Sequence, residues 1–556
     1  MVVTCAGVVV IREGPQHRGS GKILMHHGNV FNIPSGLLLG GRLSKKGSRL
    51  LTRGYSRGAA LPLLYERWDL LALLAIMLLG AALRFYGLGF QSLWADELAS
   101  WNFSQRDTVG RVIRGDTQPP LYFLILYLWQ WIFGDSEWVL RLPSALAGWL
   151  CIPAIYLLGK KLYSGREGLM AALFVAVLWA PIYYSQEARP YSMLILLSIL
   201  TSYFWWDVML GLRYRGKLPR TEAAFYLVCA VLCAYLHYFG LLLVVLQAAA
   251  LAALARGTLP KVLLLYVPLV LAYLLWLPGM IYQLRHAGAQ TGDTALQALP
   301  DYFEFLFGRS WLLALAAWTL LAFLLLRGWD DLRPLRKGGG VPPGLLLAAW
   351  TLAPFVVAYV VSQSSSEVLS DRNLLISLPA VYLLVARSVT RAFSGRAAGV
   401  FQGTVAVGLA AACLAYLLFS MDYYTTPTKE QVREAASYVV GYEDKATLIV
   451  RCDADDRLDY YLQAEKTGGT NDVEACTAKD FPKVEKRVKE GDYREVFHFI
   501  SLTEPDRQMI SMLQRNFQPV HYERFDGASV VVYKVRKTVP ANLPPPKPPP
   551  SLSRNE

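Results

Sequence analysis

Residues 70–97 read LLALLAIMLLGAALRFYGLGFQSLWADE, and this stretch decides both the class of fold and where to look for chemistry. Its first part, 70–88, contains one charge, Arg84, and has the roughly 20 apolar residues that a bilayer-crossing helix needs. Two adjacent carboxylates, Asp96 and Glu97, follow it. A solvated loop turn is the common explanation of such a pair, but ionisable groups at a membrane boundary are costly unless they are solvated, paired or functional.

The composition extends this pattern to most of the chain. Of the 556 residues, 54% are hydrophobic and only 17% are charged, which is too little polar surface for a water-soluble globule. The apolar residues gather in runs that are mostly near spanning length: 70–88, 142–158, 169–184, 193–212, 223–236, 240–254, 262–280, 311–326, 345–361, 374–386 and 400–420. We therefore expect an α-helical polytopic membrane protein with about eleven transmembrane helices.

A twelfth apolar run, 121–133, decides the orientation of every later helix. If it spans the membrane, the basic clusters at 160–166, 213–220 and 333–337 all lie outside, which inverts the positive-inside rule. If this short aromatic run lies along the outer surface, those clusters are cytoplasmic together with the basic N-terminal tail. The second arrangement agrees with the rule. It predicts the N-terminus inside, eleven spans and the C-terminal domain outside.

The same topology accounts for the net charge of +13 and for the division of the chain. The basic excess lies largely in the tail and the inner loops, where it meets anionic lipid, and no basic aromatic surface of the kind that binds nucleic acid is evident. We expect a basic, poorly ordered cytoplasmic tail or an over-long start (1–67), a transmembrane catalytic domain (68–421) with an outer loop (89–141), an extracytoplasmic α/β domain (422–539) and a disordered Pro-rich tail (540–556).

Two cysteines, Cys452 and Cys476, fall in the predicted extracytoplasmic domain. They are the only cysteines expected outside the membrane and the cytoplasm. Disulfides form and persist in oxidising compartments such as the periplasm. The sequence therefore predicts that these two cysteines pair.

Four polar clusters fall on the outer face under this topology. They are 96–97, 116–120, 185–191 and 371–373, and His237 lies beside them in the turn 236–240. Each cluster alone has an ordinary explanation as a loop, a helix cap or an interface residue. Because all four are on one face while the inner loops carry mostly orientation charge, they predict a site at the outer membrane boundary.

Two arginines in these clusters suit a phosphate. Pro190 is typical of the first turn of a helix, so Arg189 is expected at an outward-facing helix N-terminus, which favours anions. Arg372 has a similar place at the start of the run 374–386. The competing explanation for either arginine alone is snorkelling to the lipid headgroups. Together they favour a lipid-linked phosphate.

Five stretches resemble, in order, elements of one family. They read LRF at 83–85 through LWADELAS at 93–100, PPLYF at 119–123, SQEARPY at 185–191, HYFG at 237–240 and RNLL at 372–375. Over residues 70–420 they resemble the bacterial branch of the GT-C glycosyltransferases, the membrane enzymes of the protein O-mannosyltransferase (glycosyltransferase family 39) and aminoarabinose-transferase type. The resemblance implies inverting transfer of a single sugar from a polyprenyl-phosphate carrier to an acceptor hydroxyl on the outer face.

The resemblance also implies roles for residues. Asp96 matches the family's catalytic carboxylate and would accept the acceptor's proton as general base, while Glu97 would complete the catalytic pair or orient a partner. Arg189 and Arg372 would stabilise the leaving phosphate. Further candidate substrate contacts are Gln186, Glu187, Tyr191, Asp116 and Gln118. A divalent metal stays open, with His237 as its candidate ligand, although a lone interface histidine is more often structural.

Other parts of the reading stay open at this stage. The donor would be a polyprenyl-phosphate-linked sugar and the acceptor a protein, lipid or polysaccharide, in a bacterial cytoplasmic membrane with the site facing the periplasm. Neither sugar nor acceptor is specified by the sequence. The alternatives are an O-antigen ligase or polymerase that uses lipid-linked glycans, which should rely on large outer loops rich in arginine and histidine, and a transporter, which typically shows internal repeats and broken helices.

Overall fold

The structure is a computed structural model that describes residues 67–286, 298–327, 341–363, 368–393 and 397–440, parts of 447–535, and short backbone segments between residues 2 and 43. The chain forms two compact units, Met1–Leu74 and Ala75–Glu556. Within the first, β1 (Val2–Cys5), β2 (Val8–Ile11), β3 (Ser20–Leu24) and β4 (Val30–Pro34) pair antiparallel in that order, and β5 (Leu38–Leu39) pairs with β6 (Arg42–Leu43). That residues 1–67 are a poorly ordered cytoplasmic tail stays a prediction.

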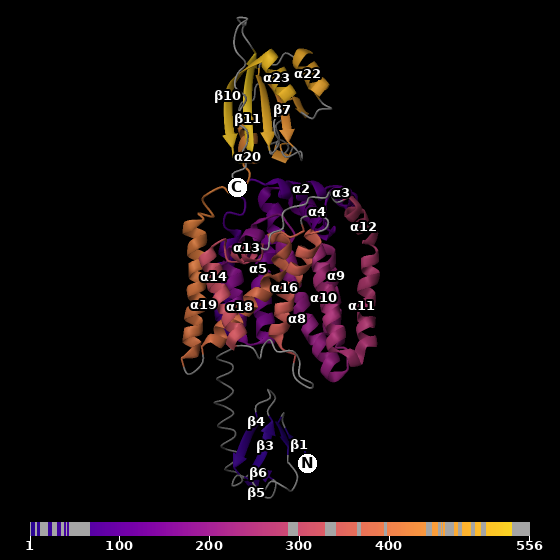
Figure 1. Cartoon of the computed structure of the whole chain (residues 1–556), viewed down its shortest axis with the longest axis vertical. Coiled ribbons are helices and arrows are strands. Elements are labelled where there is room, and N and C mark those ends of the chain that lie inside the picture. The colour runs from indigo at the N-terminus through magenta and orange to yellow at the C-terminus, as the bar shows by residue number, and fades with distance from the viewer. Residues whose placement is uncertain are drawn as a thin grey trace. The chain divides into compact units, whose positions relative to one another are not determined.

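The second unit is largely a bundle of helices (Figure 1). After the helix Arg67–Phe85 come, in chain order, α2 (Ala95–Phe103), α3 (Thr108–Gly115), α4 (Leu121–Phe133), α5 (Glu137–Leu162), α6 (Gly165–Val177), α7 (Trp179–Tyr183), η2 (Tyr184–Gln186), α8 (Tyr191–Arg215), α9 (Arg220–Leu236), α10 (Tyr238–Leu254), α11 (Leu259–Leu274), α12 (Leu277–His286), α13 (Ala298–Leu306), α14 (Trp311–Arg327), α16 (Pro343–Ser362), α17 (Asp371–Leu374), η4 (Leu375–Ser377), α18 (Leu378–Ala392), α19 (Ala398–Ala415) and the π-helical turn η5 (Tyr416–Ser420).

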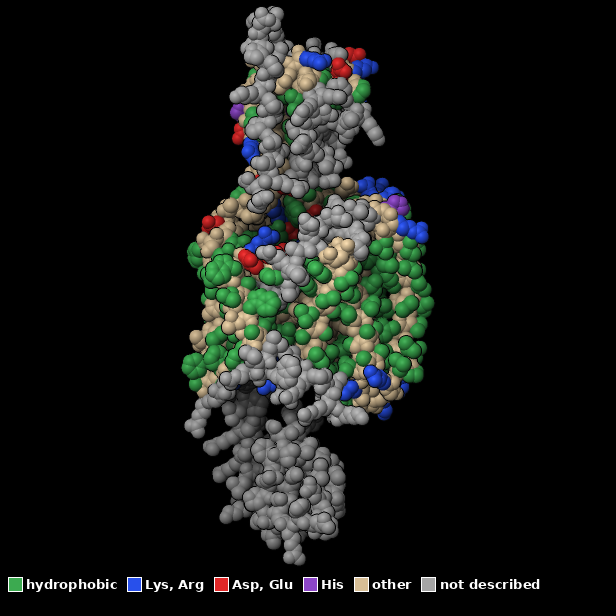
Figure 2. All heavy atoms as spheres, viewed as in Figure 1, with side chains coloured by type: hydrophobic (Ala, Val, Ile, Leu, Met, Phe, Trp, Pro, Cys, Tyr) green, Lys and Arg blue, Asp and Glu red, His purple; other side chains and the backbone are tan. Residues whose placement is uncertain are grey.

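Every apolar run predicted to span the membrane is helical. Among the described residues, seven helices are long and apolar enough to cross a membrane, and up to nine if each of two bent pairs is one span. The remaining two runs are α9 and α10, of 17 residues each, which is the short end of the spanning range. Hydrophobic side chains cover the flank of the bundle, and lysines and arginines gather toward its ends (Figure 2). The polytopic membrane fold is confirmed, while the exact number of eleven spans stays a prediction.

One of the bent pairs is a feature that the sequence did not predict. The run 169–184 breaks at Leu178 into α6 and the short α7–η2 segment, with a bend of 61°. The break exposes backbone carbonyls at the end of α6, because a helix end leaves its last carbonyls without intrahelical partners. Arg84 satisfies them from a fully buried position, donating to Val175 O at 2.6 Å and Ala176 O at 3.0 Å.

The helices pack closely where small residues face each other. A Cβ built on Gly159 of α5 would lie 2.7 Å from the Cα of Gly168 on α6, so both positions need glycine at this contact. A Cβ on Gly148 would overlap the hydroxyl of Ser185 and come within 3.3 Å of the Arg84 guanidinium. The glycines of α5 therefore let the bent segment sit against the bundle.

The short helix α4 and its neighbours α2 and α3 lie at one end of the bundle (Figure 1). α4 has 13 residues, about 20 Å of helix, which is shorter than the hydrocarbon core of a bilayer, about 30 Å. Its Tyr122, Phe123 and Leu126 are buried against the rest of the molecule. That α4 lies along the outer membrane surface stays a prediction.

The C-terminal part is a small α/β domain, as predicted. Its elements are α20 (Val432–Val440), β7 (Thr447–Asp453), β8 (Asp472–Ala475), α22 (Phe481–Glu490), β9 (Glu495–Ser501), α23 (Arg507–Asn516), β10 (Phe517–Phe525) and β11 (Ala528–Val535). The sheet order is β10-β11-β9-β7-β8, with β7 parallel to both neighbours and β11 antiparallel to both of its own. Apolar residues of α22 and α23 and of the sheet form its core. Its extracytoplasmic location stays a prediction.

Candidate active site

The two carboxylates that open α2 have different surroundings. Successive residues of a helix point in different directions, and here Asp96 keeps 29% of its side chain exposed while Glu97 is fully buried. Asp96 forms an ion pair with Arg372 of α17. The pair thus separates into one carboxylate that faces accessible space and one that is part of the protein interior.

Glu97 is held by a bidentate ion pair and two further donors. Arg141 of α5 donates from Nε to Oε1 and from Nη2 to Oε2, both at 2.7 Å, and the amide of Ala188 donates to Oε1 at 2.8 Å. Lys429, from the segment after the last span, places Nζ 3.2 Å from Oε2. Burial opposes ionisation of the carboxyl, but Arg141 and Lys429 outweigh it and lower the pKa of Glu97 to about 2.

Glu187 is the second buried carboxylate, at the end of the bent segment. Its nearest cation is Lys429, whose Nζ lies 3.7 Å from Oε1. Among the described residues neither of its oxygens accepts a hydrogen bond of normal geometry. Burial raises the pKa of Glu187 in spite of the attraction of Lys429. A buried carboxylate with spare acceptor capacity is an unusual arrangement and is typical of a binding position.

The two arginines predicted to bind phosphate differ in what they contact. Arg372 has 42% of its side chain exposed and lies with its guanidinium 5.4 Å from the centre of the Trp94 ring. Arg189 is buried, and its Nη1 donates to Asp96 O at 3.3 Å and to Ser100 Oγ at 3.2 Å. Arg372 is therefore available to a ligand, whereas Arg189 holds the first turn of α2 in place.

A cavity of about 320 Å³ lies between these groups. Its walls combine aromatic rings, two arginines and a carboxylate: Trp94, Trp179, Tyr183, Tyr184, Glu187, Arg309, Arg372, Met421, Tyr423 and Thr428. The bent segment α7–η2 supplies its rings and Glu187, so the break at Leu178 shapes the cavity. Arg309, between α13 and α14, lies 5.4 Å from the centre of the Trp179 ring. The cavity thus has two cations for an anionic group and aromatic faces for an uncharged one.

The outer-loop candidates lie near this site. Asp116 follows α3, and its carboxylate accepts a hydrogen bond from the amide of Thr117 at 2.6 Å. Burial raises the pKa of Asp116, and the nearby Arg189 opposes the rise. Tyr191 opens α8 with its ring 5.7 Å from the Arg189 guanidinium. These two residues surround Arg189 and are not among the cavity walls.

The glutamines contact backbone groups of the protein. The amide of Gln186 donates to Leu83 O, Arg84 O and Tyr86 O at 2.8–3.3 Å and so fastens the end of the helix Arg67–Phe85. Gln118 is buried, and its backbone carbonyl accepts a hydrogen bond from Gln283 at 3.1 Å. A substrate contact for either glutamine stays a prediction.

His237 occupies a structural position at the start of α10. Its Nδ1 accepts a hydrogen bond from the amide of Phe239 at 3.1 Å and so caps the helix. Burial, assisted by the charge of Arg189, lowers the pKa of His237 to about 3, so the ring is neutral at physiological pH. No group of three or more potential metal ligands occurs among the described residues. The geometry therefore favours the structural reading of this histidine.

Three charged residues of the site were missed by the sequence reasoning. Arg141 and Arg309 stand beside the apolar runs 142–158 and 311–326, which is the position that drew attention to Arg372, so the same signal could have found them. Lys429 gave no such signal, because nothing in the sequence shows that the segment after the last span folds back against α2.

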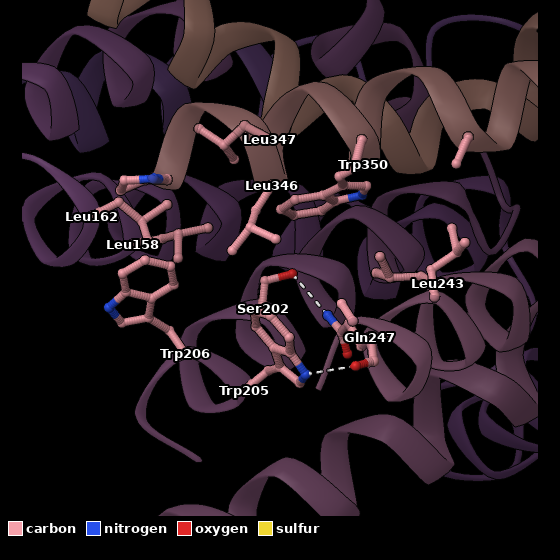
Figure 3. Close-up of a pocket in the computed structure, with 15 residues that line it drawn as sticks. Leu158, Leu162, Ser202, Trp205, Trp206, Leu243, Gln247, Leu346, Leu347 and Trp350 are labelled. Atoms are coloured by element: carbon pink, nitrogen blue, oxygen red, sulfur yellow. Dashed lines mark hydrogen bonds between the residues drawn. The ribbon is translucent and has the colours of Figure 1, made fainter. Parts of the chain in front are cut away.

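A second cavity, of about 140 Å³, lies among α5, α8, α10 and α16 (Figure 3). The polar groups drawn there bond to one another: Gln247 donates to Ser202 Oγ at 3.1 Å, and Trp205 donates to the Gln247 carbonyl at 3.1 Å. Its lining contains no ionisable group. The polar cavity beside Asp96 is therefore the candidate active site.

Comparisons with known proteins agree with this fold. Residues 117–282 match the family described as dolichyl-phosphate-mannose-protein mannosyltransferase. The solved structure of ArnT from Cupriavidus metallidurans in the apo state is similar, with a TM-score of 0.51 and 13% identity over 84% of this chain and 98% of that one. AglB from Archaeoglobus fulgidus is also similar, with a TM-score of 0.43 and 11% identity over 86% of this chain and 75% of that one.

No curated protein matches the chain. The structural likeness extends along most of the chain, while the family match is confined to 117–282, which contains the motif at 185–191 and the turn at 237–240. The predicted resemblance is therefore confirmed: this is a membrane protein of the GT-C glycosyltransferase type, similar to the protein mannosyltransferases and to ArnT.

Proposed function

We propose that this protein is an inverting glycosyltransferase that moves a single sugar from a polyprenyl-phosphate carrier to an acceptor hydroxyl. The observation that carries the proposal is Asp96, partly exposed and paired with Arg372 at the edge of a cavity that holds a second arginine. A proton acceptor and a phosphate-binding group thus stand side by side. The description of the matched family, which names a dolichyl-phosphate sugar, supports this donor class.

The reaction is a single displacement. Asp96 takes the proton from the acceptor hydroxyl as its oxygen attacks the anomeric carbon. The bond from that carbon to the phosphate oxygen breaks on the opposite face, so the configuration inverts, and polyprenyl phosphate leaves with the bonding electrons. The leaving phosphate needs charge stabilisation more than protonation, and Arg372 and Arg309 are the exposed cations of the cavity that supply it.

The sugar would occupy the cavity itself. Aromatic faces such as Trp94 and Trp179 pack against the apolar side of a sugar ring, and the free oxygens of Glu187 accept hydrogen bonds from its hydroxyls. Glu97 has no accessible atom, so in this proposal it positions α2 and does not contact the substrate. Arg189 likewise acts on α2, although a contact from Arg189 to the donor phosphate stays a prediction.

The test is sugar transfer by purified protein from a panel of polyprenyl-phosphate sugars. Asp96→Asn should lower the transfer rate by about 10²–10⁴-fold, the usual contribution of a positioned base. The matched control is Asp107→Asn in the same loop, an exposed residue paired with Arg114 whose left-handed backbone asparagine also tolerates. Transfer by Asp96→Asn at the wild-type rate would remove Asp96 from the mechanism.

We further propose a bacterial cytoplasmic membrane with the site facing the periplasm. Cysteine labelling at Ser164 and Gly216 should then occur only from the cytoplasm, and labelling at Gly468 only from outside, because the basic loops orient the protein. Labelling of Gly468 from the cytoplasm alone would reverse the proposed side.

The alternative functions make different demands on the molecule. A transporter needs a substrate path through the bundle, and the break at Leu178 is a feature that transporters share. An O-antigen ligase would transfer a whole glycan rather than one sugar. Mass spectrometry of the transfer product distinguishes all three, since a transporter yields no covalent product and a ligase yields an oligosaccharide addition.

A further inference from the structure

We infer that Lys429, in the segment that follows the last span, is a positioning residue for the active site. Through it the start of the C-terminal part of the chain holds α2 and one wall of the cavity in their working arrangement. The inference goes beyond the proposed function because it assigns a role to this segment. Only its kinetic test rests on that function.

The first observation is the burial of the Lys429 side chain between two carboxylates. The side chain is 6% exposed, and Nζ lies 3.2 Å from Glu97 and 3.7 Å from Glu187. It also lies 3.5 Å from the carbonyl of Gln186 and 5.6 Å from the centre of the Tyr183 ring. A buried lysine is rare unless it is paired, and every group around this one is an acceptor or an aromatic face.

The second observation is the charge balance of the buried cluster. Glu97 and Glu187 carry two negative charges when ionised, and Arg141 supplies one positive charge. Lys429 supplies the second. Without it an uncompensated carboxylate would remain in the interior, which is costly, and protonation of Glu187 would relieve the imbalance. A protonated Glu187 has one acceptor oxygen in place of two, so the proposed sugar contact depends on Lys429.

The third observation is that the same segment grips the chain just ahead of α2. The side-chain oxygen of Gln91 accepts hydrogen bonds from the amides of Lys429 at 2.9 Å and Thr428 at 3.1 Å. Arg433 donates to Phe90 O at 2.6 Å and Gly89 O at 3.2 Å. The loop 89–93 leads directly to Asp96, so these contacts fix where α2 begins.

The fourth observation places the segment in the cavity wall. Met421, Tyr423 and Thr428 line the same cavity as Glu187 and Arg372. α20 of the C-terminal domain begins at Val432, three residues after Lys429. The C-terminal domain is therefore attached to the active site through a segment that touches both α2 and the cavity.

The first experiment needs no knowledge of the substrate. Hydrogen exchange is measured on purified full-length wild type, on Lys429→Met, and on the control Lys486→Met, an exposed lysine of the same domain. Lys429→Met should speed exchange of amides in 89–98 by about 10-fold or more, since coupled contacts are commonly worth a tenfold change in opening. Peptides from α8 should be unchanged, as should every peptide of Lys486→Met. Unchanged exchange at 89–98 would overturn the inference.

The second experiment is a double-mutant cycle on sugar transfer, with kcat expressed per folded molecule. Lys429→Met should lower kcat by about 10-fold with Glu187 present, but by less than about 3-fold in a Glu187→Gln background, where no excess charge remains. Lys429→Arg should recover part of the lost rate. Equal losses in both backgrounds, or a loss of folded protein with kcat per folded molecule unchanged, would mean a merely structural lysine and overturn the inference.

Two further outcomes are also decisive. If Lys429→Met does not fold, the neutral pair Lys429→Met/Glu187→Gln should fold and keep the rate of Glu187→Gln, and its failure would overturn the inference. If wild type transfers no sugar at all, the proposed function fails, and the exchange experiment alone decides the role of Lys429.

Discussion

Replacement of Glu97 by glutamine should destabilise the protein by about 3 kcal/mol at neutral pH. The buried carboxyl has its pKa lowered from the ordinary 4.5 to about 2 by Arg141 and Lys429 against the cost of burial. At 1.36 kcal/mol for each unit of pKa, this difference corresponds to about 3 kcal/mol of folding free energy. Removing one partner of a buried ion pair typically costs about 3–5 kcal/mol, so two independent estimates agree.

The pH dependence follows from the direction of the shift. Because the folded pKa of Glu97 is below the unfolded one, its contribution to stability is complete above about pH 4.5 and is lost as the pH falls toward about 2. Glu97→Gln lacks this titration. The difference in stability between wild type and Glu97→Gln should therefore be constant from pH 8 to pH 5 and shrink below that.

The assay is thermal unfolding of purified protein in detergent, followed by tryptophan fluorescence across this pH range. The matched control is Glu490→Gln, an exposed glutamate 4.0 Å from Lys486, whose removal should change stability by less than about 0.5 kcal/mol. Glu97→Gln should lower Tm by roughly 5 °C or more. If Glu97→Gln and Glu490→Gln unfold at the same temperature at pH 7, Glu97 is not buried in an ion pair and the account of α2 is wrong.

Three other predictions test separate parts of the structure. Gly148→Ala should cost about 1–3 kcal/mol and lower the yield of folded protein in membranes, because the new methyl group overlaps the Ser185 hydroxyl; a normal yield would contradict the packing of the bent segment. Arg309→Ala should weaken binding of polyprenyl phosphate by about 10-fold in a titration, since a charge-assisted contact is worth about 1.5–3 kcal/mol, and unchanged binding would place the phosphate elsewhere. Mass mapping of non-reduced peptides should find Cys452 joined to Cys476, whose side chains lie outside the described residues; two free thiols would refute the pairing.

The sequence predicted the membrane fold because length and hydrophobicity are local properties. Every apolar run became a helix, and the small α/β domain could be recognised from its periodicity. The break at Leu178 could not be predicted, because a bend in an apolar run depends on a distant partner, the buried Arg84, to satisfy its carbonyls. The number of clearly spanning helices differs from the expected one for the same reason, since bent and short helices do not announce their ends in composition.

The candidate site was predicted where a charge stands next to an apolar run. Asp96, Arg189 and Arg372 do meet, as their common place on the outer face suggested. Which of them faces a ligand could not be predicted, because exposure depends on packing: Arg189 is buried under α2 and Arg372 is open. Lys429 shows the limit most clearly. Its partners are 332 and 242 residues away in the chain, so only the folded structure brings them together.

The division of labour between Asp96 and Glu97 follows from one step along a helix. Adjacent positions differ in direction, so one carboxylate faces the cavity while the next is directed into the protein. A general base must be held to within about half an ångström of its working position, and such precision comes from supporting residues that are themselves fixed. Glu97 meets this requirement because Arg141 and Lys429 fix it from α5 and from the segment after the last span. Both acids are therefore needed at this position, one to take the proton and the other to keep the helix that carries it in place.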